Sequence, residues 1–364
     1  MIKIAITASD INNIGYESVL MAFSDTRMTD FCIPIVYGSP KTAGRINKTL
    51  EIPVPGVGAV SRAEDAAAGR INIINCAGDK AARVDVSEIA DALAQASPRG
   101  LRAAVDDLKR GAVDIIITAP ASGSAPTPFE RLPQEYMDCL SAGGAREPLF
   151  MILGEGLRVV QAALEESLTG GLPHITKDGL TEQLTSFNHS LKEDFGIVRP
   201  RLAVVSQHPH EGGRNGASLS AEDNETVVPA IKDAEDGGAI VFGPYEAGRF
   251  FEGRMYERFD GILVTYCEAG AEPFDTLSAG SSFCYTAGLS AIHMSPVAGS
   301  ASETGDRGPA AEDSLRQAVY AAVDIYRNRK RQREYSRNPL RRQYFDKSGA
   351  DETVDLTKDD GSDL

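Results

Sequence analysis

His208 and His210 are two of the five histidines in the chain, and they stand in the segment Arg201-Leu-Ala-Val-Val-Ser-Gln-His-Pro-His210. An imidazole nitrogen can bind a divalent metal ion or carry a proton, and the carboxylate of Glu211 can do the same. The apolar run from Leu202 to Val205 predicts a buried strand of an α/β sheet. Ligands of such sheets bind beyond the carboxyl ends of the strands, so the segment is a candidate site. A solvated loop that holds two histidines explains the same segment equally well.

The beginning of the chain has a strand, turn and helix that could bind an anion. Residues 2–7 predict a parallel strand, residues 8–15 a turn and residues 16–23 a helix. The first N–H groups of a helix in this position can bind a phosphate or a carboxylate. The turn contains Gly15 but no G-x-G-x-x-G motif, so an ordinary βα turn is the favoured interpretation.

Strands and helices continue to alternate along the chain, which predicts an α/β fold. Further strands are expected at residues 31–37, 71–76, 114–118, 147–153, 157–163, 239–242 and 261–266. Helices are expected at residues 41–50, 87–109 with a break near 97–100, 176–195 with Thr176 as the N-cap, 225–234 and 312–325. Residues 56–69 are predicted to be irregular, and residues 284–296 are rich in small side chains, without a predicted strand.

Length, charge and cysteine content limit the class of protein. The 364 residues are enough for two domains, and an apolar fraction of 42% fits a globular chain. The net charge of −15 argues against binding to nucleic acid or to an anionic membrane surface. The five cysteines include no C-x-x-C pair, and we find no signal peptide or membrane-spanning run. We therefore expect a cytoplasmic protein that has neither nucleic acid nor membrane as a partner.

Several exact strings carry a resemblance to a known family. They are Ile6-Thr7-x-x-Asp10-x-x-x-x-Gly15, Thr118-Ala-Pro120, Phe195-Gly-Ile-Val-Arg-Pro-Arg201, Pro209-His210, Tyr266-x-x-x-Gly270, Thr286-Ala-Gly-Leu289, Ser295-Pro-x-x-Gly299 and Glu312-Asp-Ser. Over roughly residues 1–330 the chain resembles the 4-hydroxythreonine-4-phosphate dehydrogenases of pyridoxal phosphate (vitamin B6) biosynthesis. These enzymes share the isocitrate/isopropylmalate dehydrogenase fold.

The resemblance implies two α/β domains with a cleft between them and a homodimer. The first domain would comprise residues 1–122 with 290–330, the second residues 123–289 with the dimer and metal-site region. A basic then acidic tail, residues 331–364, would be disordered in part. The implied reaction is oxidation of a hydroxyl group to a ketone, then decarboxylation, with NAD or NADP as cofactor. Cofactor contacts would come from Thr286, Gly288, Gly299 and Ser300.

Members of the family bind a divalent metal ion with three histidines from across the dimer interface. For this chain the resemblance implies zinc, manganese or magnesium. Matched position by position, Glu165, His210 and Cys267 stand at the three ligand positions in this chain. All three side chains are competent zinc ligands. The alternative is that the metal site has been lost and that a single histidine remains of it.

The substrate site also departs from the family pattern. A shortened Gln134-Glu135 replaces a Gly-His-Thr-Glu string, and Asp275, Cys284 and His293 replace a lysine, an asparagine and an arginine. An aspartate in place of a lysine reverses a charge-assisted attraction to phosphate worth about 1.5–3 kcal/mol. We therefore expect weak binding of the phosphorylated substrate of the family.

Three functions remain possible from the sequence. The chain could be a working NAD-linked dehydrogenase with an altered site, which requires Glu165, His210 and Cys267 to hold a metal. It could instead bind another small molecule without redox chemistry. It could also be a regulatory partner that dimerises with an intact relative. Metal affinity distinguishes the first of these functions from the other two.

Overall fold

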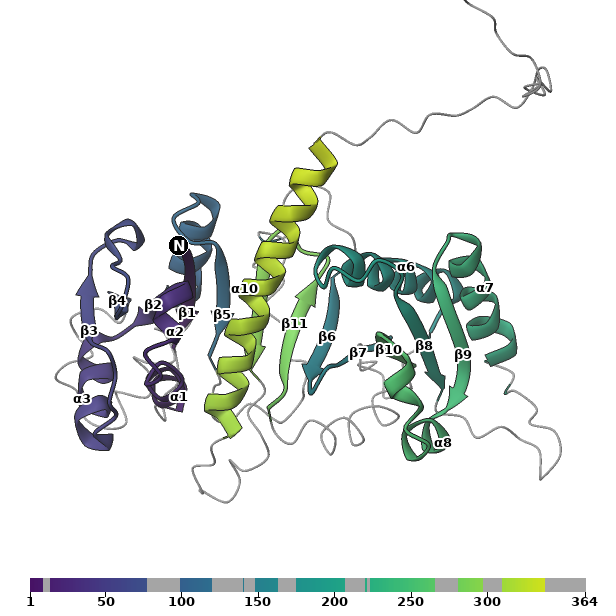
Figure 1. Cartoon of the computed structure of the whole chain (residues 1–364), viewed down its shortest axis with the longest axis horizontal. Coiled ribbons are helices and arrows are strands. Elements are labelled where there is room, and N and C mark those ends of the chain that lie inside the picture. The colour runs from purple at the N-terminus through teal and green to yellow at the C-terminus, as the bar shows by residue number, and fades with distance from the viewer. Residues whose placement is uncertain are drawn as a thin grey trace, which may run out of the picture.

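The computed structural model describes residues 1–8, 14–76, 99–119, 140, 148–162, 175–206, 220, 223–265, 281–296 and 310–337. Within these residues, twelve strands form one mixed sheet in the order β3-β4-β2-β1-β5-β12-β11-β6-β7-β10-β8-β9 (Figure 1). The first six strands in that order are parallel to one another, and so are the last four. The antiparallel strands β11 and β6 join the two groups.

The strands are short, and most of their residues are buried. Their bounds are β1 Ile2–Thr7, β2 Cys32–Gly38, β3 Val57–Val60, β4 Ile71–Asn75, β5 Ile115–Thr118, β6 Leu149–Gly154, β7 Leu157–Gln161, β8 Arg201–Ser206, β9 Ile240–Glu246, β10 Gly261–Val264, β11 Phe283–Ala287 and β12 Ile292–Pro296. Strands that are buried on both faces are typical of a sheet covered by helices on each side.

Helices cover both faces of this sheet. Their bounds are α1 Ile14–Ala22, α2 Met28–Phe31, α3 Pro40–Leu50, residues 99–109, α6 Lys177–Glu193, α7 Val228–Asp236, α8 Ala247–Glu252 and α10 Ala310–Arg337. Figure 1 shows α10 crossing the sheet between the N-terminal strands and the helices α6 and α7. No helix in the described ranges is long and apolar enough to cross a membrane.

Two sides of the sheet have separate apolar cores. On one side, α1, α6, α7 and α10 pack on residues such as Ile117, Tyr285 and Met294. On the other side, residues 99–109 pack on β1, β2 and β5, and α8 packs on β8 and β10. Because side chains alternate along a strand, each strand of the centre contributes to both cores.

The start of α6 and its packing on the sheet follow from a few residues. The Thr176 side chain accepts a hydrogen bond from the N–H of Gly179, which confirms the predicted N-cap. Gly261 begins β10 beneath this helix. A Cβ atom on Gly261 would lie 2.5 Å from Phe187 Cζ and 2.9 Å from Leu191 Cδ1. The helix can approach β10 this closely only because position 261 has no side chain.

The substitution Gly261→Ala is therefore expected to lower the free energy of unfolding by about 1–3 kcal/mol, since the fully buried Phe187 and Leu191 have little room to move. The matched control is Gly44→Ala in α3, where no atom lies within 4 Å of the added methyl group. That control should stabilise the chain by about 0.5–1 kcal/mol through helix propensity. Equal urea midpoints for the two variants would contradict the close packing.

The structure also corrects the sequence predictions. Residues 284–296, for which no strand was predicted, contain the antiparallel pair β11 and β12 at the centre of the sheet. The segment predicted as irregular contains β3. The last helix continues beyond the predicted range to Arg337, so the beginning of the predicted tail, residues 331–337, is helical. The α/β class itself is confirmed.

Candidate functional site

A polar cluster occupies the middle of the sheet, on β5, β11 and β12. His293 in β12 is 2% exposed and lies directly opposite Thr286 in β11. Thr286 Oγ1 is 3.1 Å from Nδ1 of the imidazole, and Thr118 Oγ1 is 3.3 Å from Nε2. The register of β5 and β12 pairs His293 with Ile116, which places Thr118 on the same face two residues further along. Both ring nitrogens therefore have a hydroxyl partner.

Burial sets the charge of this histidine. Removal from water lowers the pKa of His293 from 6.5 to about 4, so the imidazole is neutral at pH 7. A neutral ring has one donor and one acceptor nitrogen, which the two threonine hydroxyls can match. The resemblance puts His293 in place of a substrate-binding arginine, and a neutral imidazole does not supply the positive charge of that arginine.

We expect the His293 imidazole to remain neutral in the folded chain until the pH falls to about 4. Above pH 6.5 the ring is neutral in both states, and between pH 6.5 and 4 only the unfolded chain takes up the proton. Stability is therefore lost as the pH falls through this window, by roughly 3 kcal/mol for this group. Imidazole NMR signals, assigned with His293→Gln, measure the midpoint, and a midpoint near 6.5 would contradict burial of a neutral ring.

Three predicted site residues lie together on the β11–β12 pair. Cys284 and Thr286 of β11 are 7% and 3% exposed, and the Thr286 hydroxyl is engaged by His293. Gly288 follows with φ of 83°, in the left-handed region that glycine favours. Gly288 is half-buried, and Thr286 is the other predicted cofactor residue within the described ranges. The other predicted substrate and cofactor residues, Gln134, Glu135, Asp275, Gly299 and Ser300, lie outside the described ranges.

Three neighbouring parallel strands end together at one edge of the sheet. The registers of β7, β10 and β8 place Gln161, Val264 and Val205 side by side. The predicted metal ligands follow these strand ends within a few residues and lie outside the described ranges: Glu165 after β7, Cys267 after β10 and His210 after β8. The described ranges themselves contain no group of three or more His, Cys, Asp or Glu residues able to hold a metal ion.

Two buried oxygen atoms near these segments lack a partner in the described part of the chain. Thr265 directly follows β10 and is 1% exposed, and its Oγ1 makes no hydrogen bond there. Asp223, also 1% exposed, begins the π-helical turn Asp223–Val227 before α7, and its Oδ2 is unpaired. A buried carboxylate oxygen is costly unless a cation or a donor reaches it. The aligned strand ends and these oxygens therefore fit a bound metal ion or another polar ligand.

A buried network that the sequence did not reveal holds the β11–β12 turn from the α10 side. Arg329 Nε donates to Asp194 Oδ1 at 2.6 Å, and the Tyr285 hydroxyl donates to Asp194 Oδ2 at 2.8 Å. Arg329 Nη1 also donates to the carbonyl oxygens of Leu289 and Ser290, at 3.1 and 3.3 Å. Arg329 lies in a basic run, residues 327–333, whose other charged residues are exposed. The signal for burial was its helical spacing, three residues beyond the half-buried Tyr326.

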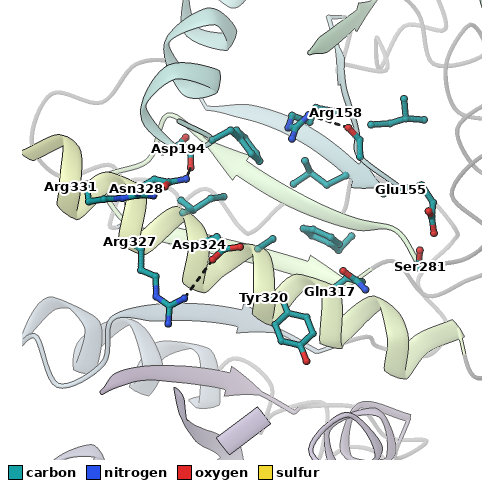
Figure 2. Close-up of a pocket in the computed structure, with 18 residues that line it drawn as sticks. Glu155, Arg158, Asp194, Ser281, Gln317, Tyr320, Asp324, Arg327, Asn328 and Arg331 are labelled. Atoms are coloured by element: carbon teal, nitrogen blue, oxygen red, sulfur yellow. Dashed lines mark hydrogen bonds and ion pairs between the residues drawn. The ribbon is translucent and has the colours of Figure 1, made fainter. Parts of the chain in front are cut away.

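A groove of about 730 Å³ runs along α10 on the face opposite to His293 (Figure 2). Its floor includes Phe283, which points to the α10 side, whereas the next residue of β11, Cys284, points to the other. Three arginines and three acids line the groove: Arg158, Arg327, Arg331, Glu155, Asp194 and Asp324. None of the predicted site residues in the described ranges contributes to it. The groove is thus separate from the candidate site.

Known proteins match nearly the whole chain. A family model described as "Pyridoxal phosphate biosynthetic protein PdxA" matches residues 30–322. A 4-hydroxythreonine-4-phosphate dehydrogenase of Bacteroides thetaiotaomicron is 37% identical over 349 residues, 95% of this chain and 94% of the relative. A Cutibacterium acnes relative, provisionally named a D-threonate 4-phosphate dehydrogenase, is 27% identical over 334 residues, 89% and 94% of the two chains.

The solved structures agree with the predicted fold class. The 4-hydroxythreonine-4-phosphate dehydrogenase of Klebsiella pneumoniae has a TM-score of 0.69 at 22% identity, and the match covers 88% of this chain and 100% of that one. At this identity the likeness is one of fold, and it confirms the predicted class.

Proposed function

The chain belongs to the PdxA family of pyridoxal phosphate biosynthetic proteins, and from this membership we propose that it is a 4-hydroxythreonine-4-phosphate dehydrogenase-like oxidoreductase. The proposed reaction oxidises a hydroxyl group of a phosphorylated hydroxy amino acid to a ketone and then releases carbon dioxide. Bound NAD or NADP would accept the hydride, and a divalent metal ion would polarise the reacting oxygen.

One observation carries this proposal, namely the alignment of the carboxyl ends of β7, β10 and β8. Each strand leads within a few residues into one of the three proposed metal ligands, Glu165, Cys267 and His210. All three proposed ligands therefore follow one edge of the sheet, the edge at which ligands of α/β folds bind. The oxygens of Thr265 and Asp223 that have no partner among the described residues support a polar site in these segments.

A second candidate is a relative that binds a different small molecule or an intact family member. The neutral, doubly hydrogen-bonded His293 favours this candidate, because it stands where the family has a phosphate-binding cation. Asp275 in place of a lysine points in the same direction. Under either candidate we expect the substrate site to have a weaker attraction for phosphate than in the family.

Metal titration of the chelator-stripped protein tests the two candidates. Calorimetry with Zn²⁺, Mn²⁺ and Mg²⁺ in the presence of NAD should give saturable binding of one ion per subunit. NADH absorbance should then rise, only with metal present, with 4-hydroxythreonine 4-phosphate or D-threonate 4-phosphate as substrate. The absence of both metal binding and NADH formation would rule out the dehydrogenase and leave the second candidate.

The assembly and location belong to the same proposal. We propose a cytoplasmic homodimer, because the family shares its metal site across the dimer interface and because the cysteine pattern is typical of a reducing compartment. Sedimentation equilibrium of the purified chain measures the assembly. A monomer at micromolar concentration would contradict a shared site.

A further inference from the structure

A second cavity on α10 has a charge balance unlike that of the groove in Figure 2. This cavity, which we call the Tyr326 pocket, has a volume of about 530 Å³. It lies where the end of the 99–109 helix meets the β11–β12 turn and α10, at the amino ends of β5 and β12. Its charged lining residues are Lys109, Asp114, Arg329, Lys330 and Arg333, four cations and one anion, against three of each in the groove.

The single acid of the pocket is hydrogen-bonded to neutral donors and forms no ion pair with the cations of the described residues. Asp114 Oδ1 accepts the Tyr326 hydroxyl at 3.1 Å, and its Oδ2 accepts the backbone N–H of Lys3 at 2.8 Å. Burial and the Asp114 carboxylate raise the pKa of Tyr326, while the nearby charge of Arg333 opposes the rise. Tyr326 therefore remains a protonated donor directed at Asp114, and Arg333 lies within electrostatic reach of it.

The remaining cations have no acidic partner within the described ranges. Arg329 is paired with Asp194 at 2.6 Å and adds no net charge. In contrast, no ion pair of the described residues involves Lys109, Lys330 or Arg333. Two of these cations, Lys330 and Arg333, share one face of α10 with Tyr326 through helical spacing. Three positive charges with no ion-pair partner among the described residues, against the one carboxylate of Asp114, thus meet at one cavity of a chain whose net charge is −15.

We propose that the Tyr326 pocket binds a small anion with at least two negative charges, a phosphorylated compound or a di- or tricarboxylate. The ammonium groups of Lys109 and Lys330 and the guanidinium of Arg333 would contact its oxyanions. The apolar walls, Leu108, Leu140 and Ile292, would contact its carbon skeleton. The volume lies in the range of small-molecule sites. None of the proposed metal, substrate or cofactor residues in the described ranges lines this pocket, and Thr118, which contacts His293, lies at the opposite, carboxyl end of β5.

Calorimetric titration of the full chain with pyrophosphate, and separately with citrate, tests the proposal. We expect saturable binding of one anion per subunit at physiological ionic strength. Lys330→Gln combined with Arg333→Gln should weaken it by about 30-fold or more, because two charge-assisted contacts are removed. The control Arg327→Gln combined with Arg337→Gln removes the same charge from the same helix outside the pocket and should weaken binding less than about threefold.

Either of two results would contradict the proposal that the Tyr326 pocket binds an anion. Absence of saturable binding of both anions would mean that the cations only stabilise the helix ends and keep α10 solvated. An equal loss of anion affinity in the Lys330/Arg333 variant and in the Arg327/Arg337 control would mean that the anion is attracted to the whole helix and not to the pocket. Stronger binding of pyrophosphate or of citrate would support the pocket and identify the phosphate or the carboxylate class. Since no metal or substrate takes part, binding should persist in His210→Ala, which separates this test from that of the proposed function.

Discussion

Replacement of Arg329 by methionine is expected to lower the free energy of unfolding by about 3–5 kcal/mol, because the buried Asp194 carboxylate would lose its cation. The two side chains are 10% and 3% exposed, and their contact is 2.6 Å. The substitution also removes the donors to the carbonyl groups of the β11–β12 turn. Since the chain has no tryptophan, urea unfolding followed by far-UV circular dichroism measures the change.

Two controls separate the buried charge from a general loss of an arginine. Arg254 forms an exposed ion pair with Glu257, with side chains 71% and 53% exposed, so Arg254→Gln should cost less than about 1 kcal/mol. Removing both buried partners, as Arg329→Met with Asp194→Leu, should recover part of the loss, since no charge remains uncompensated. A double variant less stable than Arg329→Met alone would show that packing, rather than the unpaired charge, dominates.

The sequence predicted those parts of the fold whose signals are local. The apolar run at residues 202–205 became β8, Arg201–Ser206, and Thr176 caps α6. The strand β1 has the predicted bounds, Ile2–Thr7. In each case the signal, a continuous apolar run or a capping side chain, lies within a few residues of the element that it specifies. These elements could therefore be predicted without knowledge of partners distant in the sequence.

The β11–β12 pair shows why the rest could not be predicted. Apolar Phe283, Tyr285, Ile292 and Met294 alternate with small or polar residues, but each alternating run is only five residues long. They form strands because β6 and β5, distant in sequence, pair with them on either side. Arg329 is similar, since its burial depends on Asp194, which comes from another helix end. Non-local pairing of this kind leaves little trace in a single stretch of sequence.

The candidate site was predicted by residue type more fully than by geometry. The resemblance assigned Cys284 and His293 to the substrate site and Thr286 to the cofactor site, and the structure places all three on one strand pair. It did not indicate that His293 would be buried and neutral between two threonines, because Thr118 reaches it from β5. Glu165, His210 and Cys267 remain predictions, supported by the order of the strands that precede them.

The substitution His210→Ala is expected to weaken metal binding by at least about 100-fold and to reduce metal-dependent NADH formation at least as much. The imidazole is the one proposed ligand that keeps the residue type of the family, and alanine supplies no donor atom in its place. The free energy of unfolding should not change, because residue 210 lies beyond the buried strand β8. Calorimetry of the metal-free variant with Zn²⁺ gives the affinity, and urea unfolding gives the stability.

His189 provides the matched control for this variant. It lies on α6, its side chain is 46% exposed, and its Nδ1 is 3.3 Å from Glu193 Oε2. His189→Ala removes one imidazole from the chain and should leave metal affinity unchanged, whereas Glu165→Ala and Cys267→Ser should weaken it as His210→Ala does. If His210→Ala bound zinc like the unmodified chain, the edge formed by β7, β10 and β8 would not be the metal site. The aligned strand ends would then have to serve a ligand held without metal, as the second candidate function requires.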